Sequence, residues 1–378
     1  MTDYTFASTY MWGGSLALYW SVIDRHLCVF ANGTGDLTML MPPMPFGDVR
    51  DGDGRNCLAN CFEIMDEYND RVSDRSHSRI EYISEEFLAS VQSSSPFGVH
   101  VTSMSGDYIY EMQRMVDLAG GNLKSKRHAR SKFMREYPDH RTEALGAEHV
   151  DSCMELLERW CRHGDACHLG EVNDSNVATD ILRHRDFHAT KRALQTYRDL
   201  GLTGMVLYVG ETLVGFTLGE AISDSQASIL IEKTHPDYHG SAQFIFSEFC
   251  RQYWSHLQEC NVGDDWGIPS LQFTKESYRP IRMLAKHVLQ RETVTMVGGF
   301  DLEPAAVAGR IEAISEAEST SSSDSSRAFD LSFRPARMED VSAILALEQR
   351  CFDSAAETFN RRQVRNLITS PARRCIDC

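Results

Sequence analysis

The 378-residue sequence has no apolar run that approaches the roughly 20 residues needed to cross a bilayer as a helix. Met1–Trp20 lacks a positively charged leading segment, and Gly13, Gly14 and Ser15 interrupt its apolar residues, which argues against a signal peptide. The eleven cysteines follow no regular spacing, so free thiols in a reducing compartment are expected rather than a disulfide framework. We therefore expect a cytoplasmic protein with at most peripheral contact with the inner face of the membrane.

The motifs of several enzyme classes are also missing. There is no Walker loop, no Rossmann glycine fingerprint and no GxSxG nucleophile elbow, which argues against the common nucleotide-binding and serine-hydrolase designs. The segment Cys161–His168 shows neither the paired CxxC spacing of a zinc site nor a second pair downstream, and Cys153 and Cys161 fall on an apolar stripe. We expect no metal site and no tightly bound cofactor.

The sequence is acidic overall, with a formal net charge of −16, but it contains one basic segment. The overall field repels phosphates, which argues against non-specific binding to DNA or to an anionic membrane. The cations of Lys124–Arg135 are not interrupted by an acidic residue: Lys124, Lys126, Arg127, Arg130, Lys132 and Arg135. On a helix, Lys126 and Arg130 share a face that can grip phosphates of tRNA or of a lipid head group. The alternative is a solvated surface helix.

Apolar periodicity predicts an α/β fold, and the 42% hydrophobic content can supply a sizeable core. The first region is expected to contain strands at 16–23, 26–30 and 37–41 and helices at 57–68 and 87–91. The second is expected to contain, in order, a strand at 137–145, helices at 150–161 and 179–200, strands at 205–209, 213–218 and 228–231, helices at 240–257 and 271–278, and a strand at 293–297. This second order is typical of a GNAT acyltransferase domain.

Four segments carry a resemblance to a known family: Phe6–Phe30, Asp107–Phe133, Glu232–His235 and Asn261–Pro280. The last of them, NVGDDWGIPSLQFTKESYRP, is the most specific. Together they resemble the C-terminal domain of phosphatidylglycerol lysyltransferase. The resemblance implies two tandem GNAT-like domains, at 1–135 and 136–300, each a mixed, mostly antiparallel sheet flanked by helices.

The remainder of the chain differs in composition. Residues 301–328 include an acidic, Ser-rich run that is expected to be a flexible linker. Within residues 329–378, the segment FRPARMEDVSAILALEQRCF resembles the opening strand and first helix of a further GNAT acetyltransferase domain, so a partial GNAT-like unit is expected there.

Characterised members of the resembled family move an aminoacyl group from a charged tRNA to a lipid head group or a sterol hydroxyl. The resemblance therefore implies an acyltransferase with aminoacyl-tRNA as donor and a lipid or small-molecule acceptor. Val262 and Gly263 depart from the family, which usually has Arg and Glu at these positions. This departure leaves two alternatives open: an acyl-CoA-dependent N-acetyltransferase and a non-catalytic GNAT-fold binding module.

Three residues are candidates for catalysis: Asp265, Glu232 and Tyr278. If the adjacent carboxylates Asp264 and Asp265 share a desolvated cleft, one pKa rises, and Asp265 can hold the α-amino group of an aminoacyl donor or act as a base. Glu232 can order the nucleophile, and Tyr278 resembles the GNAT tyrosine that protonates the leaving group. The structural alternatives are a Gly-containing turn for Asp265, a surface ion pair with Lys233 for Glu232, and a packed tyrosine.

Besides Lys126, Arg127 and Arg130, the expected phosphate-binding residues are Lys233, Gly240, Ser241, Lys275 and Arg279. Gly240 and Ser241 open a helix directly after a strand, where free N–H groups and the positive helix end attract anions. The equivalent turn of GNAT enzymes holds the pyrophosphate of coenzyme A, and a tRNA 3′ end can use it here. The alternative is an ordinary glycine at a helix start.

Overall fold

The computed structural model describes residues 5–32, 36–45, 53–71, 78–92, 99–163 and 177–291. The expected strand at 293–297, the linker at 301–328 and the partial GNAT-like unit at 329–378 lie outside the described residues. The helices are α1 Phe6–Trp12, α2 Asp53–Asn69, α3 Glu85–Gln92, α4 Met112–Asp117, α5 Lys124–Glu136, α6 Val150–His163, α7 Val177–Thr196, α8 Ser241–Phe249 and α9 Pro269–Glu276. In the part of the chain with assigned structure, no helix is both long and apolar enough to cross a membrane.

The strands form one continuous, mostly antiparallel sheet in the order β1-β2-β3-β5-β12-β6-β11-β10-β9-β8-β7, with β4 paired to β2. Their bounds are β1 Ala17–Ile23, β2 His26–Asn32, β3 Leu37–Met39, β4 Met44–Pro45, β5 Arg79–Ser84, β6 Val99–Glu111, β7 His140–Ala144, β8 Thr203–Val209, β9 Thr212–Ala221, β10 Gln226–Thr234, β11 Glu259–Asn261 and β12 Arg282–Arg291. The pair β10–β11 and the pair β3–β5 are parallel. The predicted fold class, a mixed and mostly antiparallel sheet flanked by helices, is confirmed.

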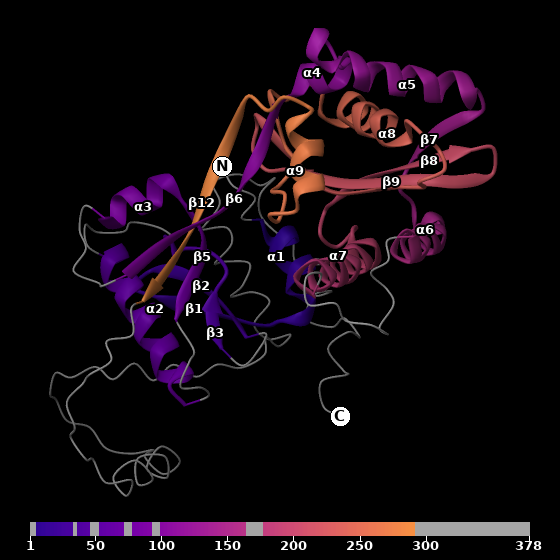
Figure 1. Ribbon diagram of the computed structural model, residues 1–378. Helices are drawn as coiled ribbons and strands as arrows, with labels where there is room; N and C mark the ends of the chain where they lie inside the picture. The colour runs from indigo at the N-terminus through magenta and orange to yellow at the C-terminus, as the bar shows by residue number, and fades with distance from the viewer. Residues whose placement is uncertain are drawn as a thin grey trace, which may run out of the picture.

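Helices cover the second half of the sheet on both faces. On one face, α4, α5 and α8 pack over a core that includes Met115, Phe133 and Phe246; on the other, α1, α6 and α7 pack over a core that includes Leu157 and Leu194. Figure 1 shows α5 and α8 above β8 and β9, and α6 and α7 below them. The GNAT-like order of the second half therefore has the expected layers.

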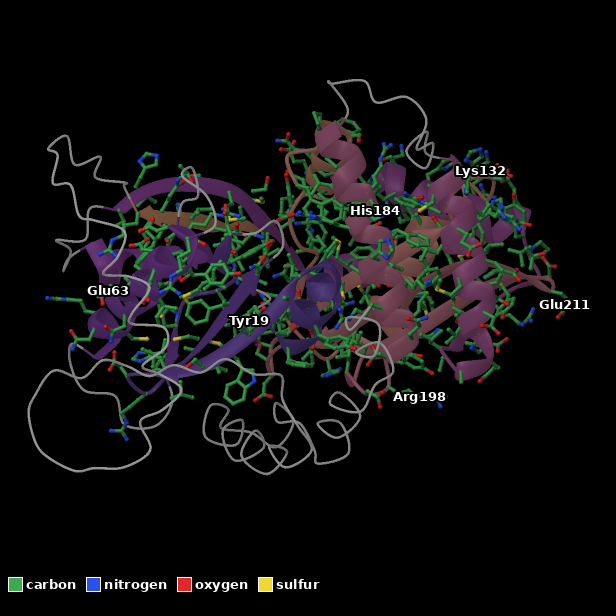
Figure 2. The ribbon with its side chains drawn as sticks, turned by 90° about the horizontal axis from the view of Figure 1, so that it is seen from below. Tyr19, Glu63, Lys132, His184, Arg198 and Glu211 are labelled. Atoms are coloured by element: carbon green, nitrogen blue, oxygen red, sulfur yellow. The ribbon has the colours of Figure 1, made fainter. Side chains whose placement is uncertain are left out.

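The first half packs α2 and α3 against the strands β1 to β5, around a separate core that includes Phe30, Phe62 and Ile80. Figure 2 shows the two halves side by side, with Tyr19 and Glu63 in the first and Lys132 and Glu211 in the second. The chain crosses between them: α4 and α5 precede residue 136 but pack on the second half, and β12 inserts between β5 and β6. The division at residues 135 and 136 stays a prediction.

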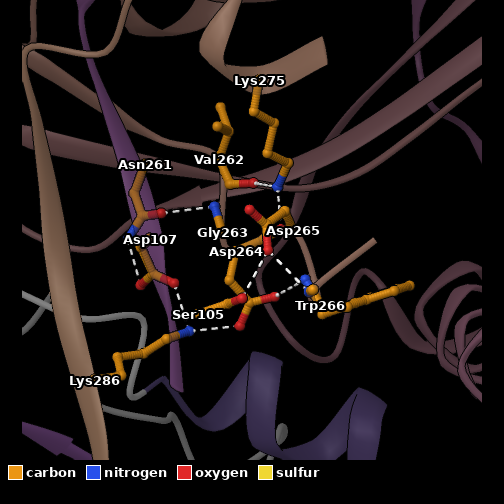
Figure 3. Close-up of polar contacts among 11 residues, drawn as sticks. Ser105, Asp107, Asn261, Val262, Gly263, Asp264, Asp265, Trp266, Lys275 and Lys286 are labelled. Atoms are coloured by element: carbon orange, nitrogen blue, oxygen red, sulfur yellow. Dashed lines mark hydrogen bonds and ion pairs between the residues drawn. The ribbon is translucent and has the colours of Figure 1, made fainter. Parts of the chain in front are cut away.

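A buried ion cluster holds the crossing of β6 and β12 together. Lys286 on β12 donates from Nζ to Asp107 Oδ1 at 2.6 Å and to Asp264 Oδ2 at 2.7 Å, and the Lys286 and Asp107 side chains are only 2% and 1% exposed. Asn261 donates to the other Asp107 oxygen at 3.2 Å (Figure 3). Burial alone lowers the pKa of Lys286, but the two carboxylates outweigh it and raise the pKa above its usual value. The ammonium thus stays charged and joins three separate segments of the chain.

Replacing this lysine should destabilise the protein strongly. In Lys286→Met, Asp107 and Asp264 lose their cation inside the protein, so the free energy of unfolding should fall by about 3–5 kcal/mol, measured by chemical denaturation. Arg291→Met on the same strand is the matched control. Arg291 pairs with Asp66 at 2.7 Å with both side chains about a third exposed, so its loss should cost at most about 1 kcal/mol. Equal losses in the two variants would contradict the assigned role of the cluster.

Candidate functional site

The second half of the sheet opens where β10 and β11 separate. These parallel strands pair only between Gln226–Ser228 and Glu259–Asn261. β11 then ends at Asn261, whereas β10 continues to Thr234 with β9 as its neighbour, and its register shifts between Ile229 and Ile231. Beyond Ser228, β10 therefore pairs with β9 along one edge. Its other edge is no longer paired with β11 and faces other elements of the fold.

Glu232 lies in this stretch of β10. Its side chain is only partly exposed and is surrounded by protein. This burial raises the pKa of its carboxyl from 4.5 to about 8, although the charge of Lys233 acts in the opposite direction. A carboxyl with this pKa exchanges its proton near neutral pH, which is the property required of a general acid or base. The expectation that Glu232 is a catalytic residue therefore remains as a proposal.

Tyr278 follows Ser277, the residue after α9, and lies close enough to Glu232 for the charge of that carboxylate to act on its hydroxyl. Burial and the negative charge of Glu232 hold the pKa of the Tyr278 hydroxyl above its usual range, and a hydrogen bond with the Gln243 side chain acts in the opposite direction. The ring stacks on Tyr110 of β6 at 5.9 Å and meets Phe246 of α8 edge-on at 5.4 Å. Tyr110 also donates from its hydroxyl to the Lys275 carbonyl at 2.8 Å, which anchors the end of α9.

Lys126 of α5 covers the other side of the tyrosine ring. Its Nζ lies 4.5 Å from the Tyr278 ring centroid, a cation–π contact, and burial lowers the pKa of the ammonium. Glu232, Lys126, Gln243 and Tyr278 come from β10, α5, α8 and the end of α9, and we call them the Glu232 cluster. Gln243 and Tyr110 were not among the residues predicted from the sequence, although Tyr110 falls within the family-like segment Asp107–Phe133.

Lys233 does not join this cluster, because successive strand residues point to opposite faces of a sheet. Its Nζ donates to Asp186 of α7 at 2.7 Å and lies 4.3 Å from the Trp160 ring centroid, and the residue is buried. The structure therefore corrects two expectations for Lys233. It forms no surface ion pair with Glu232, and its ammonium is already neutralised and cannot face the same phosphate as Lys126.

A surface hollow lies on this opposite face of the sheet. It is lined by residues of α6 and of the β8–β9 hairpin, among them Arg159, Tyr208 and Glu211. It shares no residue with the Glu232 cluster, so it is separate from the candidate site.

The two arginines of α5 also differ from expectation. Arg127 donates to the carbonyls of Leu118 and Gly120, at 2.6 and 3.2 Å. Arg130 donates to the carbonyls of Val116 and Asp117, at 3.0 and 3.3 Å. These carbonyls lie at the end of α4, where a helix leaves acceptors without intrahelical partners. Both guanidinium groups therefore cap α4, and the expected phosphate-binding role does not fit them.

Asp265 is held inside the turn that follows β11. Its Oδ1 accepts from Ser105 Oγ at 2.7 Å (Figure 3) and from the Gly267 amide at 2.9 Å, and its Oδ2 accepts from the Tyr108 hydroxyl at 2.6 Å. Burial raises the pKa of this carboxyl, but the three hydrogen bonds outweigh it and lower the pKa below its usual value. A carboxylate stabilised in this way is a poor base. Its oxygens already accept hydrogen bonds from Ser105, Tyr108 and the Gly267 amide instead of from a substrate. The turn interpretation fits Asp265, and the predicted catalytic role does not.

Lys275 has a similar structural role. Its Nζ donates to the carbonyls of Val262 and Asp264, each at 2.5 Å, and burial lowers the pKa of the ammonium to about 8 against the raising effect of the nearby carboxylates. Its ammonium thus connects α9 to the turn, and the expected phosphate-binding role does not fit it. Arg279 is exposed, has a positive φ of 60° and directly follows Tyr278, so a phosphate contact at the edge of the Glu232 cluster remains a proposal for it.

The start of α8 is covered by α5. Gly240 has a φ of 91°, and a Cβ added there would lie 2.3 Å from the Ala129 carbonyl oxygen of α5. Ser241 is only 2% exposed. The close approach of two helices explains the glycine, so the expected open phosphate turn at Gly240 and Ser241 does not fit this packing.

Substituting this glycine should therefore be costly. Gly240→Ala combines a positive φ with a clash against backbone, whereas Gly120→Ala keeps the same φ of 91° with nothing within 4 Å of the new Cβ. We expect Gly120→Ala to cost about 1–3 kcal/mol of stability from backbone strain. Gly240→Ala should cost a further 1–3 kcal/mol or so from overpacking, measured by chemical denaturation. Equal costs would show that α5 does not approach Gly240 closely.

The raised pKa of Glu232 predicts a pH-dependent stability. Between its usual pKa of 4.5 and about 8, the folded protein keeps a proton that the unfolded chain has lost, so native stability falls as pH rises through this window. Glu232→Gln cannot ionise. Relative to the wild type it should gain roughly 2–4 kcal/mol across the window, a range set below the full shift because the side chain is partly solvated. Glu211→Gln, at a side chain that is 97% exposed, is the control; parallel pH profiles for wild type and Glu232→Gln would contradict the burial of this carboxyl.

Comparisons with known proteins agree with this architecture. An uncharacterised protein of Mycoplasmoides gallisepticum is 25% identical over 187 residues, which are 49% of this chain and 56% of that protein, so the chain spans little more than half of this relative. A conserved protein of unknown function from Bacteroides thetaiotaomicron has a similar structure, with a TM-score of 0.65 and 23% identity over 77% of this chain and 91% of that one. The C-terminal domain of a putative lysylphosphatidylglycerol synthetase from Agrobacterium fabrum gives a TM-score of 0.53 and 13% identity over 82% and 90%.

The family comparison covers most of the chain. The model of the family "Phosphatidylglycerol lysyltransferase, C-terminal" matches residues 1–289, which include both halves of the sheet and the Glu232 cluster. Transfer of a lysyl group is an acyl transfer, so the family is one of acyltransferases, the class predicted from the sequence. The chain belongs to the phosphatidylglycerol lysyltransferase C-terminal family.

Proposed function

We propose that the chain transfers an aminoacyl group from aminoacyl-tRNA to a hydroxyl of a lipid or other amphipathic acceptor. Membership of the lysyltransferase family supports the class of reaction. The observation that carries the site is Glu232, a carboxyl whose pKa burial raises to about 8 at the point where β10 leaves β11. Burying an ionisable carboxyl costs free energy, so its presence near the buried hydroxyl of Tyr278, whose pKa it helps to raise, favours a functional reason.

Glu232 is the proposed general base. In its ionised form it accepts the proton of the acceptor hydroxyl while the oxygen attacks the ester carbonyl of the aminoacyl donor, and a new ester bond forms. The bond to the terminal ribose oxygen of the tRNA then breaks. Glu232 later returns its proton to solvent. With a pKa of about 8, it has appreciable basicity and is still partly ionised near neutral pH.

Tyr278 and Lys126 are proposed to act on the leaving side. The raised pKa keeps the Tyr278 hydroxyl protonated, so it can donate a hydrogen bond, and then a proton, to the departing ribose oxygen, after which it regains a proton from solvent. Gln243 orients this hydroxyl. Lys126, which lies over the tyrosine ring and forms no ion pair within the described residues, supplies positive charge for the terminal phosphate of the tRNA.

The exposed cations of α5 extend this positive surface. Lys124, Lys132 and Arg135 are exposed, and among the described residues only Lys132 pairs with an acid, Glu136 at 3.5 Å, in a solvated pair that contributes little. In a chain with a net charge of −16, such a local surface is where a tRNA backbone can approach. Because the donor is a cytoplasmic molecule, we propose a cytoplasmic location with peripheral contact with the inner face of the membrane.

The two alternatives are less well supported. Acetylation from acyl-CoA needs an open pyrophosphate turn, but α5 packs against the start of α8 at Gly240. A non-catalytic binding module gives no reason to keep the Glu232 carboxyl beside a buried tyrosine. Aminoacyl transfer uses both features without requiring the coenzyme A turn.

Substitution of the proposed base should remove activity without unfolding the protein. Glu232→Gln is expected to slow aminoacyl transfer by about 10²–10⁴-fold, the usual contribution of a general base, while Glu211→Gln transfers at the wild-type rate. The wild-type rate should rise with pH through about 8 as Glu232 ionises.

Lys126→Met should weaken tRNA binding and reduce the dependence of binding on salt concentration.

The assay supplies radiolabelled aminoacyl-tRNA pools and lipid vesicles to the purified full-length chain, and mass spectrometry identifies the product. Transfer by Glu232→Gln at the wild-type rate would remove Glu232 as the base. Labelled product from acetyl-CoA but from no aminoacyl-tRNA would replace the proposal with acetylation. No product from either donor, with the chain folded, would favour the binding module.

A further inference from the structure

Three cysteine thiols meet in the core of the first half, far from the Glu232 cluster in the fold. Cys28 lies in the middle of β2, and Cys57 and Cys61 lie one turn apart on α2, which packs on that strand. The sulfur atoms are separated by 3.5 Å for Cys28–Cys57, 3.5 Å for Cys28–Cys61 and 4.0 Å for Cys57–Cys61. All three residues are fully buried. They form a triangle of sulfurs in which each sulfur is a neighbour of the other two.

The size of this triangle fits a metal ion. A tetrahedral Zn²⁺ with Zn–S bonds of about 2.3 Å separates its sulfur ligands by about 3.8 Å, and the three measured separations lie on both sides of this value. A disulfide requires an S–S distance of about 2.0 Å, and none of the three pairs has it. The backbone therefore already places the sulfurs where three thiolate ligands of one zinc ion belong.

His26 offers a fourth ligand on the same face of β2, two residues before Cys28. It is only 4% exposed, and its Nδ1 lies 2.7 Å from the Asp24 carbonyl oxygen. A carbonyl only accepts, so Nδ1 carries the proton and Nε2 keeps a free lone pair, which is the arrangement of a metal-binding histidine. Nε2 faces the start of α2, one turn before Cys57, since a Cβ built on Gly54 would lie 3.5 Å from it.

The imidazole is not part of the close triangle. The ligand atoms that all lie within 4.8 Å of one another are the three sulfurs, so the His26 ring must approach them when a metal binds. Asn60 of α2 donates to Asp24 Oδ2 at 2.6 Å and ties the β1–β2 turn to the helix, so His26 is held next to the helix that carries Cys57 and Cys61 and only its side chain has to move.

We propose that Cys28, Cys57 and Cys61, with His26 as the fourth ligand, bind one Zn²⁺ that fastens α2 to β2. Binding exchanges the thiol protons, which pass to solvent, for one dication held by three thiolates and a neutral imidazole. The site is structural: its ligands are enclosed by the apolar core around Phe30, Leu58 and Phe62 and leave no open position for a substrate. It makes no use of the aminoacyl transfer proposed above.

The metal content of the full-length chain tests this site. Protein expressed in zinc-supplemented medium and purified under reducing conditions should contain one zinc per chain by mass spectrometry. Cys57→Ser should lose it, and His26→Ala should bind it more weakly. Cys153→Ser is the control, because Cys153 is equally buried but lies in the core of the second half; this variant should keep its zinc.

Cobalt provides a readout that does not depend on a folded variant. Metal-free wild-type protein titrated with Co²⁺ should develop thiolate-to-metal charge-transfer bands and the intense visible bands of tetrahedral coordination, and chelation should lower its melting temperature. Substoichiometric zinc together with no cobalt spectrum would overturn the proposal. The thiols would then be packed as free core residues, or, if a mass loss of two hydrogens appears, joined in a disulfide through Cys28.

Discussion

A lysine ammonium enclosed by two carboxylates is the constraint on which the arrangement of this molecule depends. Lys286, Asp107 and Asp264 come from β12, β6 and the turn after β11, and each would be costly to bury without the others. Their contact requires that β12 run beside β6 in the first half while β11 runs beside the end of β6 in the second. One continuous sheet across both halves is the geometric result.

The same cluster determines where the candidate site can form. The turn that follows Asn261 is held from one side by Lys286 and from the other by Lys275, so the chain leaves the sheet there instead of continuing beside β10. β10 continues past this point paired with β9, and its other edge at Glu232 faces no strand of the described residues. The anchored turn also leads into α9, whose end is tied to Tyr110 and is followed by Tyr278. The segment from Asp264 to Tyr278 thus begins at the buried ion cluster and ends at the Glu232 cluster.

Periodicity and family-like motifs were sufficient to predict the fold class and many of the elements, but not the strands β5 and β12. The expected helices at 57–68, 150–161 and 179–200 correspond to α2, α6 and α7, and the strands at 205–209 and 213–218 to β8 and β9. The helix expected at 240–257 was only partly correct, since α8 ends at Phe249 and a π-helical turn, Cys250–Trp254, follows. These features are local, so the order of apolar residues determines them.

The roles of charged residues were harder to predict, because they depend on which segments meet in space. Arg127 and Lys126 are neighbours in a basic run, yet one caps α4 and the other covers Tyr278. The cysteine triangle of the first half was not predicted, because Cys28 is far in sequence from Cys57. In addition, Cys57 and Cys61 have helical rather than CxxC spacing. A search for cysteines one helical turn apart, opposite a buried strand cysteine, is the signal that would have found them.

Two carboxyls of the family-like segments show that the surroundings of a side chain, and not its place in a motif, determine whether it can act as a base. Asp265 and Glu232 were equal candidates, and both are surrounded by protein. Asp265 receives hydrogen bonds from Ser105, Tyr108 and the Gly267 amide, so its charged form is favoured and its pKa falls. Burial of Glu232 outweighs the opposing charge of Lys233, so its neutral form is favoured and its pKa rises to about 8. Since a base must both hold and release a proton near the working pH, the carboxyl with fewer stabilising donors is the one suited to catalysis.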